Sequence, residues 1–515
     1  MLSKVWSAGI RGIDGFMVRV ELDLVNGLPT FTTVGLPDSS VREARERVVS
    51  AVRNSGFEFP GRRITVNLAP AELRKGGTQF DLPIGLGALM ASEQIPMQSR
   101  SSVLCFVGEL ALDGSVRPVS GVLPMTTSAK NHGMQGIVVP RENLREARAV
   151  PGIESYGVSS LREASELLRG CAPQENLESE EAANSGATKE DEIQDMNEVR
   201  GQALARRALE IAAAGGHNLL MMGTPGTGKS MLARRLTGIL PPLTSDESLE
   251  VMRIYSVCGL LGPGVGIMRN RPFRAPHHTT TPTALIGGSA RCKPGEVTLA
   301  HCGVLFMDEW PEFGRDSLET LRQPLEDRCV TISRLRESVT YPSDFTLVAA
   351  MNLCPCGKLG TLPSRCRCSE PAIRRYRSQI SGPLLDRMDL RVELSPLPFS
   401  EWMTHPGPSP ESSAVVRERV LKARAEALAR YDETGETLNA RLGYAAVRKF
   451  CMPNSSGLAL VETAAQKNRL SARGLDRLLR VARTIADMEN SKQVDRRHVA
   501  EALQYRSLDL EGREF

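Results

Sequence analysis

Apolar residues recur with two different spacings in the first part of this chain of 515 residues. Alternating apolar residues predict a strand at 16–22, and strands are also predicted at 64–68 and 103–107. Residues 39–55 carry apolar side chains at helical spacing, whereas 82–92 are apolar on nearly all sides. We therefore predict a mixed α/β domain that contains one amphipathic helix and one buried helix.

A different pattern begins after Val199. A helical segment is followed by an apolar run of strand length at 217–222, a glycine-rich loop and a second helix from 231. Apolar strands return at 304–307 and 345–350. Apolar strands that alternate with helices are typical of a parallel sheet covered by helices.

An acidic segment separates the two regions. Residues 174–195 carry eight acidic residues and one lysine, with almost no large apolar side chain, which indicates a solvated linker. From about Ser413 the pattern is almost wholly helical, with a break at Pro453. The predicted division is an N-terminal domain at 1–172, a linker at 173–196, a nucleotide-binding core at 197–398 and a helical domain at 399–515.

The loop at 223–230 carries the strongest chemical signal. It consists of Gly223, Thr224, Pro225, Gly226, Thr227, Gly228, Lys229 and Ser230, a complete phosphate-binding loop between a predicted strand and a predicted helix. The glycines allow backbone N–H groups to close around phosphates, and the helix N-terminus adds partial positive charge. Lys229 can reach the β- and γ-phosphates, and the Ser230 hydroxyl can ligate Mg²⁺. We predict that the protein binds ATP with Mg²⁺.

Three further polar residues follow apolar strands of the predicted sheet. Asp308 and Glu309 follow the strand at 304–307, and Asp308 lies 79 residues after Lys229. We predict that Asp308 holds Mg²⁺ and that Glu309 polarises the attacking water as a general base. Asn352 follows the next strand, at the edge where parallel sheets bind ligands, and can orient the same water. The alternative is an Asn352 that only caps a turn.

The composition is that of a soluble globular protein, with 41% hydrophobic and 24% charged residues. No apolar run approaches the ~18 residues that a membrane span requires. The N-terminal residues lack the apolar core of a signal peptide. We therefore expect a cytoplasmic protein that does not contact membranes. The net charge of +4 is too small to indicate a nucleic-acid partner by itself.

Four of the eleven cysteines form a cluster. They are two Cys-x-Cys pairs, Cys354 with Cys356 and Cys366 with Cys368, in a loop without an apolar core of its own. This spacing predicts one structural zinc ion with four thiolate ligands, and the alternative is four free cysteines. The same region is rich in basic residues, which either contact phosphates or form a solvated face. These residues are Lys358, Arg365, Arg367, Arg374, Arg375 and Arg377.

Two arginine motifs complete a resemblance to the AAA+ ATPases of the Mg-chelatase and replicative-helicase branch. Segment 382–390 contains Arg387 at the place of that branch's arginine finger, and 470–476 contains Arg473 at the place of its second sensor arginine. The resemblance implies that Arg387 completes the ATP site of a neighbouring subunit, and hence that the subunits form a ring, a hexamer in that branch. It places Arg473 on a lid helix over its own subunit's nucleotide. Taken alone, either arginine is an ordinary surface or ion-pair residue.

Four further motifs narrow the resemblance to the YifB/ComM family of Mg-chelatase-like proteins, over essentially the full length. They lie at 273–279, 284–288, 294–296 and 352–357. The resemblance implies a three-layer αβα AAA+ core with a helical lid. It also implies a hexameric helicase that acts on single-stranded or branched DNA, in branch migration during recombination or natural transformation. Nothing in the chain resembles the integrin-type metal-binding domain of chelatase partners, which argues against porphyrin metallation.

The N-terminal domain resembles the proteolytic domain of Lon-type proteases at 106–119 and 136–143. The resemblance implies a ribosomal S5 domain 2-like α/β fold. Lon-type enzymes use a serine activated by a lysine. In the matching segments, 77–82 contains no serine and 120–124 contains no lysine. Thr78 is a conceivable substitute nucleophile without a lysine at the matching place. We therefore predict no peptidase activity, and a role for this fold in assembly or DNA contact.

Two hypotheses remain for the substrate of the motor. The first is DNA, with Arg291 and Lys293 between the two nucleotide motifs holding phosphates in the pore. The second is a protein partner, in a remodelling or chelatase-type motor. Protein-threading rings carry an aromatic pore residue, and Phe273 is the only Phe, Tyr or Trp between 264 and 296. We favour DNA, bound by backbone electrostatics rather than stacking, because aromatic residues make up only 4% of the chain.

Overall fold

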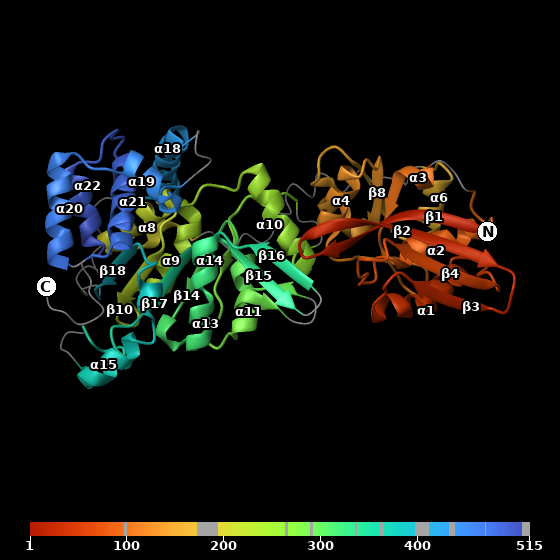
Figure 1. Cartoon of the computed structure of the whole chain (residues 1–515), viewed down its shortest axis with the longest axis horizontal. Helices are drawn as coiled ribbons and strands as arrows, with labels where there is room; N and C mark the ends of the chain where they lie inside the picture. The colour runs from red at the N-terminus through yellow and green to blue at the C-terminus, as the bar shows by residue number, and fades with distance from the viewer. Residues whose placement is uncertain are drawn as a thin grey trace. The chain divides into compact units, whose positions relative to one another are not determined.

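The computed structural model describes residues 1–96, 100–171, 194–262, 266–288, 292–334, 337–360, 365–396, 411–431, 438–468 and 470–506 (Figure 1). The chain divides into two compact units. The N-terminal unit is Met1–Glu190 with Thr244–Arg269, and the second unit is Asp191–Leu243 with Asn270–Phe515. The predicted acidic linker falls almost entirely at 172–193, outside the described residues, and so does Arg291.

Seven described strands form the main sheet of the N-terminal unit. Their order across the sheet is β3 (Thr30–Val34), β4 (Arg63–Ala69), β2 (Asp14–Val25), β1 (Leu2–Arg11), β5 (Leu104–Phe106), β8 (Gly136–Pro140) and β9 (Glu154–Val158). β2 pairs antiparallel with β1 and β4, whereas the other neighbouring strands are parallel. The alternation predicted for β2 is confirmed, because Val18, Val20 and Leu22 are buried while Arg19 is exposed.

Helices cover both faces of this sheet. α1 (Ser39–Asn54), α2 (Asp81–Ala91) and α6 (Leu161–Leu168) contribute to the apolar core on one face, and α4 (Val122–Asn131) and α5 (Leu144–Arg148) to the core on the other. β8 supplies both cores, since Val138 packs with the first set of helices and Ile137 with the second. The predicted amphipathic and buried helices are confirmed. Short elements complete the unit: α3 (Arg100–Val103), η1 (Arg141–Asn143), β6 (Glu109–Leu110) and β7 (Val116–Arg117).

Helix α10 (Ser245–Cys258) belongs to the N-terminal unit, although it follows the phosphate-binding loop in the sequence. It packs against α4, where Met252 lies in a small apolar cluster with Leu123 and Val150. The Ser256 hydroxyl donates a hydrogen bond to the carboxylate of Glu146. The sequence after the phosphate-binding loop therefore supplies part of the N-terminal unit's core.

A five-stranded parallel sheet forms the centre of the second unit. Its strand order is β11 (Phe273–Arg274), β14 (Val304–Met307), β17 (Thr346–Met351), β10 (Leu219–Gly223) and β18 (Leu390–Leu394). All residues of β10 and β14 are buried, as expected for central strands of a parallel sheet. The prediction of a parallel sheet with flanking helices is confirmed. Because parallel strands end at the same edge, the segments after β10, β14 and β17 lie together.

Helices α8 (Ala203–Gly215) and α9 (Lys229–Ile239) pack together and share one apolar core with the C-terminal helices. The C-terminal helices are α18 (Ser413–Tyr431), α19 (Tyr444–Phe450), α20 (Ser455–Asn468), α21 (Ala472–Met488) and α22 (Arg496–Gln504), which confirms a helical C-terminal region. Of the helices described here, none is long and apolar enough to cross a membrane. The remaining elements are η3 (Met196–Glu198), α11 (Pro282–Ile286), β12 (Gly287–Gly288), β13 (Lys293–Pro294), α12 (Glu296–Leu299), η4 (Trp310–Glu312), α13 (Arg315–Thr320), α14 (Arg322–Asp327), β15 (Cys329–Arg334), β16 (Glu337–Pro342), α15 (Glu370–Arg377), α16 (Gly382–Leu385) and η5 (Asn439–Arg441).

Candidate nucleotide-binding site

The loop between β10 and α9 has the backbone conformation that a phosphate-binding loop requires. Gly226 and Gly228 adopt φ angles of +82° and +90°, in the left-handed region that residues with a Cβ rarely enter. Gly228 precedes the first turn of α9, and no side chain caps that turn. The N–H groups at this helix N-terminus therefore have no side-chain cap, as expected at a site for an anion.

Lys229 lies over this loop and is only 8% exposed. Its Nζ atom donates hydrogen bonds to the carbonyl oxygens of Gly223 at 2.8 Å and Thr224 at 2.9 Å, and to Oδ1 of Asn352 at 3.2 Å. Burial lowers the pKa of Lys229, while the nearby Asp308 and Glu309 carboxylates act in the opposite direction. Neutral carbonyl oxygens are weaker partners for an ammonium group than phosphate oxygens are. The amine is thus held at the loop by contacts that a phosphate can replace.

Ser230 and Asp308 come together beside Lys229, from α9 and from the end of β14. The Ser230 hydroxyl donates to Oδ2 of Asp308 over 2.5 Å, and the backbone N–H of Glu309 donates to Oδ1 of Asp308 at 3.0 Å. A hydroxyl and a carboxylate at the edge of a phosphate-binding loop are oxygen donors of the kind that Mg²⁺ prefers. The two predicted magnesium ligands are therefore adjacent in the folded chain.

Glu309 occupies a turn directly after Asp308, with a φ of +51°. Its side chain is 55% exposed, and Oε2 lies 3.6 Å from Nδ1 of His278. The His278 ring is 4.1 Å from the ring of His277, centroid to centroid. The motif at 273–279 thus brings an imidazole to the predicted general base, a contact that the sequence pattern did not reveal.

The two predicted arginines lie in different settings. Arg387 follows α16, donates from Nη1 to the carbonyl oxygen of Pro383 at 2.8 Å, and pairs through Nη2 with the carboxylate of Glu326. Arg473 is exposed at the first turn of α21. Within the described residues, neither arginine forms a hydrogen bond or an ion pair with the carboxylate of Asp308 or Glu309 of its own chain.

The four clustered cysteines meet in space. The Sγ atom of Cys354 lies 3.4 Å from that of Cys356 and 3.6 Å from that of Cys366, and Cys356 and Cys366 are 3.7 Å apart. The ligand atoms of all four cysteines, including Cys368, lie within 4.8 Å of one another. Tetrahedral zinc with Zn–S bonds of about 2.3 Å places its sulfurs about 3.8 Å apart. The sulfur positions therefore fit one zinc ion.

The cysteine loop, which we define as the described residues 354–360 and 365–368, packs against the phosphate-binding loop through Gly357. A Cβ placed on Gly357 would lie 2.8 Å from Cγ of Pro225, and Gly357 has a φ of +72°. Only glycine allows this approach without displacing Pro225. In the sequence, the glycine directly after the Cys354–Cys356 pair is the one sign of a close contact. The sequence does not indicate that Pro225 is the residue contacted.

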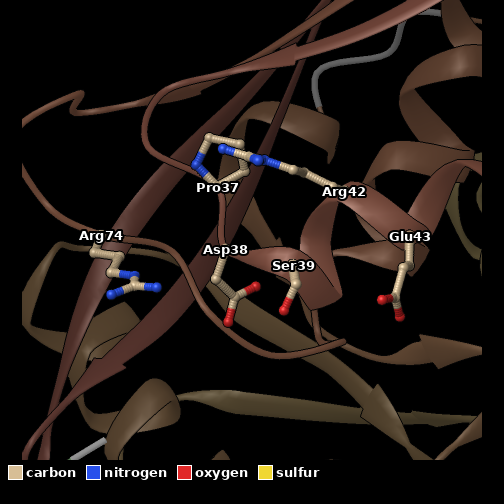
Figure 2. A pocket seen from close by; sticks show the side chains of 6 residues that line it. All are labelled: Pro37, Asp38, Ser39, Arg42, Glu43 and Arg74. Atoms are coloured by element: carbon tan, nitrogen blue, oxygen red, sulfur yellow. The ribbon is translucent and has the colours of Figure 1, made fainter. Parts of the chain in front are cut away.

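A separate shallow pocket of about 430 Å³ lies in the N-terminal unit, at the start of α1 (Figure 2). Asp38 caps that helix by accepting the backbone N–H of Val41, so its carboxylate already has a structural task. The charges of Arg42 and Arg74 are matched by those of Asp38 and Glu43. This surface therefore does not compete with the phosphate-binding loop as the nucleotide site.

Family models match three parts of the chain. Their descriptions are magnesium chelatase, subunit ChlI, at 195–402; subunit ChlI of Mg-chelatase, at 20–143; and magnesium chelatase, subunit ChlI C-terminal, at 410–506. The chain is also 42% identical to the uncharacterized protein YifB of Salmonella typhimurium over 508 residues, which cover 99% of this chain and 97% of that protein. It is 42% identical to the competence protein ComM of Haemophilus influenzae over 515 residues, 98% of each chain. The chain belongs to the YifB/ComM family of Mg-chelatase-like AAA+ proteins.

This YifB/ComM-family chain also resembles Lon proteases at its N-terminus. It is 25% identical to Lon protease 2 of Bacillus subtilis over 146 residues, 27% of this chain and 26% of that protein. The predicted fold class is thus confirmed, with a Lon-like α/β N-terminal region, an AAA+ core with a parallel sheet, and a helical C-terminal region. Membership of the YifB/ComM family implies ATP and Mg²⁺ as ligands.

In the Lon-like part of this YifB/ComM-family protein, Thr78 and Lys75 are the hydroxyl and the amine to be compared with a nucleophile and its base. The Thr78 hydroxyl donates to the carboxylate of Glu109. Lys75 is buried, and its Nζ atom has no hydrogen-bond partner among the residues that the structure describes. Thr78 and Lys75 therefore do not form the hydrogen-bonded pair that a hydroxyl nucleophile and its base require.

Proposed function

We propose that this protein is an ATP-driven ring motor that acts on DNA, as a helicase or branch-migration translocase in recombination or natural transformation. The observation that supports hydrolysis most directly is the meeting of Lys229, Asp308 and Asn352 at the phosphate-binding loop of an AAA+ family member. Each residue has a role that follows from that arrangement.

The phosphate-binding loop holds the nucleotide, and Lys229 exchanges its backbone acceptors for the β- and γ-phosphates. Ser230 and Asp308 fit Mg²⁺, because a hydroxyl and a carboxylate oxygen lie side by side there. When bound, Mg²⁺ neutralises charge on the phosphate oxygens. In this proposal the backbone loop positions the substrate and the side chains of α9 and β14 stabilise its charge.

Glu309 acts as the general base that takes a proton from the attacking water, and Asn352 orients that water. The pairing of Glu309 with His278 keeps the carboxylate at the site but turned toward an imidazole. Hydrolysis then requires the carboxylate to turn toward the water. The exposed position of Glu309 leaves room for that rotation.

Arg387 serves a neighbouring subunit's nucleotide in the proposed ring, a hexamer. Its guanidinium contacts Glu326 and Pro383 and, among the described residues, does not pair with Asp308 or Glu309 of its own chain, which is compatible with action in trans. Arg473 covers the nucleotide of its own subunit from the start of α21. An arginine at the transferred phosphate stabilises the charge of the transition state.

DNA is the proposed substrate for two reasons. One full-length relative is named a competence protein, and competence is the capacity to take up DNA. In addition, Lys293 is exposed in the β12–β13 hairpin, between the two nucleotide motifs, where it can contact phosphates. A motor that remodels a protein partner, or a chelatase-type motor, is the alternative.

Three further assignments accompany this function. We propose a structural zinc in the cysteine loop, because four sulfurs leave no open position for a reacting water. We propose that the Lon-like region is not a peptidase, because Thr78 is bonded to Glu109 instead of to an amine. We also propose a cytoplasmic location, in keeping with eleven cysteines of which none forms a disulfide in the described residues.

The test is ATP hydrolysis by the full chain without DNA, with single-stranded DNA and with branched DNA, at rising salt concentration. We expect several-fold stimulation by DNA that declines as salt rises, and no hydrolysis by Lys229→Ala. Hydrolysis that depends on Lys229 but is indifferent to DNA would overturn the DNA assignment and favour the protein-remodelling alternative.

A further inference from the structure

The positive charge of this protein is concentrated in the cysteine loop and in the segment that follows it. Residues 352–381 contain six basic residues and one acidic residue, Glu370, so their net charge of +5 exceeds the +4 of the whole chain. The basic residues are Lys358, Arg365, Arg367, Arg374, Arg375 and Arg377. A local excess of this size, on a chain that is otherwise balanced, indicates an anionic partner for this surface.

Three of these cations face solvent with little to neutralise them. Arg367, Arg374 and Arg375 are exposed, and among the described residues their one ion pair joins Arg374 to Glu370, 3.2 Å apart. In that pair the two side chains are 75% and 82% exposed, so the ion pair is weak. A phosphate, which guanidinium groups bind with two hydrogen bonds, can displace Glu370 at little cost.

The exposed arginines are carried on an anchored frame. On α15, Tyr376 is buried, and Nη2 of Arg377 donates to the carbonyl oxygen of Leu353 at 3.2 Å. Arg367 lies between two of the clustered cysteines, Cys366 and Cys368. The sulfur cluster and the helix thus hold Arg367, Arg374 and Arg375 on one short stretch of chain instead of on a free loop.

The same frame is joined to the nucleotide site. Cys354 is two residues beyond Asn352, which accepts a hydrogen bond from Lys229. Gly357 contacts Pro225 of the phosphate-binding loop, and a Cβ on Gly360 would lie 4.0 Å from Cγ2 of Thr224. The cysteine loop therefore packs on the phosphate-binding loop and is also joined to Lys229 through Asn352.

We propose that the cysteine loop and α15 form a DNA contact surface that binds backbone phosphates and passes DNA occupancy to the phosphate-binding loop through Gly357 and Pro225. This inference rests on the proposed function, since it names where on the ATPase unit DNA is held. The chemistry favours a nucleic-acid backbone over stacked bases, because Tyr376, the one aromatic residue in 352–381, is buried. Arginine-rich, sequence-independent contacts of this kind bind phosphates.

The experiment measures binding of fluorescent single-stranded DNA to the full chain by anisotropy at several salt concentrations, alongside ATP hydrolysis. The test variant is the triple substitution Arg367→Gln, Arg374→Gln and Arg375→Gln. The matched control removes three exposed cations of the C-terminal helical region, Lys422→Gln, Arg448→Gln and Lys492→Gln. A second triple variant has lysine at the same three positions and so keeps the positive charge. Its DNA affinity shows whether a loss in the glutamine variant comes from the missing charge or from a disturbed fold.

We expect the glutamine triple variant to bind DNA about tenfold more weakly at ~0.1 M salt. The slope of the logarithm of its binding constant against the logarithm of salt concentration should also be shallower, by the amount that corresponds to the loss of roughly three phosphate contacts. Its hydrolysis without DNA should stay within about twofold of the wild type, while stimulation by DNA is lost. The control triple and the lysine triple should retain most of the affinity.

Three results would overturn the inference. If the glutamine triple binds DNA as the wild type does while the wild type is stimulated by DNA, the surface is not the contact, and the proposed function stands. If polyglutamate of equal charge displaces DNA from the wild type but not from the glutamine triple, the surface binds acidic protein instead. If the wild type itself neither binds DNA nor responds to it, the proposed function fails, and the inference fails with it.

Discussion

Asp389 accepts a hydrogen bond from Arg477 across 3.2 Å, and so joins the segment that carries Arg387 to the helix that carries Arg473. Burial alone would raise the pKa of Asp389, but the His217 ring and the charge of Arg477 hold it below its usual range. Oδ2 of Asp389 also accepts the backbone N–H of Asn218, just before β10. The segments that carry the two predicted catalytic arginines are therefore fixed to the strand that leads into the phosphate-binding loop.

Action of Arg387 in trans predicts complementation between two defective variants. Arg387→Ala should lower the rate of hydrolysis about 10³-fold or more, and Glu309→Gln should also be defective. In rings that contain both variants, some sites combine an intact Glu309 with a neighbour's intact Arg387. We expect the mixture to recover up to about a quarter of wild-type activity if subunits mix at random. A mixture no more active than its two components would contradict a site shared between subunits.

A general-base role for Glu309 predicts a loss of turnover without a loss of binding. Glu309→Gln keeps the size of the side chain but cannot take a proton, so kcat should fall by roughly 10²–10⁴-fold. The affinity for ATP, measured with a fluorescent ATP analogue, should change by less than about threefold. Glu312→Gln alters a nearby exposed carboxylate and should leave both quantities unchanged. Equal effects of the two substitutions on kcat would show that Glu309 is not the general base.

Zinc in the cysteine loop predicts about one zinc ion per chain, measured by mass spectrometry of the acid-digested protein. Cys356→Ser with Cys368→Ser should remove the metal, and nucleotide affinity should drop several-fold because Gly357 packs against Pro225. Cys171→Ser removes an exposed cysteine outside the cluster and should change neither quantity. Zinc-free wild-type protein with full nucleotide affinity would show that the loop folds without a metal.

The docking of α10 in the N-terminal unit predicts a pH dependence of stability. Burial raises the pKa of Glu146, although hydrogen bonds from Ser256, Leu123 and Asn143 oppose the shift. The folded state therefore holds this proton more tightly than the unfolded state does. As pH rises from the unfolded pKa of 4.5 through the folded value, the contribution of Glu146 to the free energy of unfolding decreases.

Glu146→Gln removes this proton exchange while it keeps an oxygen that accepts hydrogen bonds. Relative to the wild type, the variant should therefore gain thermal stability as pH rises above about 4.5, and the gain should level off once the wild-type carboxyl is fully ionised. Thermal unfolding curves of the two full chains across the acidic and neutral pH range measure the difference. Parallel pH profiles would show that Glu146 does not titrate differently on folding.

The sequence was informative where local spacing decides the structure. The strand, loop and helix around Lys229 and the buried strand before Asp308 follow from neighbouring residues, because glycine conformation and apolar runs act over a few positions. The adjacency of Ser230 and Asp308 follows in turn from the common edge of parallel strands.

Contacts between distant segments could not be predicted in the same way. The spacing of apolar residues in α10 does not name α4 of the N-terminal unit as its partner. The approach of Gly357 to Pro225 and that of His278 to Glu309 depend on how loops pack on the finished sheet. The roles of Arg387 and Arg473 stay predictions, because they concern a nucleotide and a neighbouring subunit.

In the proposed function, ATP hydrolysis at the site of Lys229 drives movement on DNA. The most direct measurement follows a fluorescently labelled branched DNA junction during incubation with the full chain, with ATP or ADP and with the Lys229→Ala variant. We predict conversion of the junction to its migrated products with ATP, and none with ADP or with Lys229→Ala. ATP hydrolysis that leaves the junction unchanged would contradict a DNA motor.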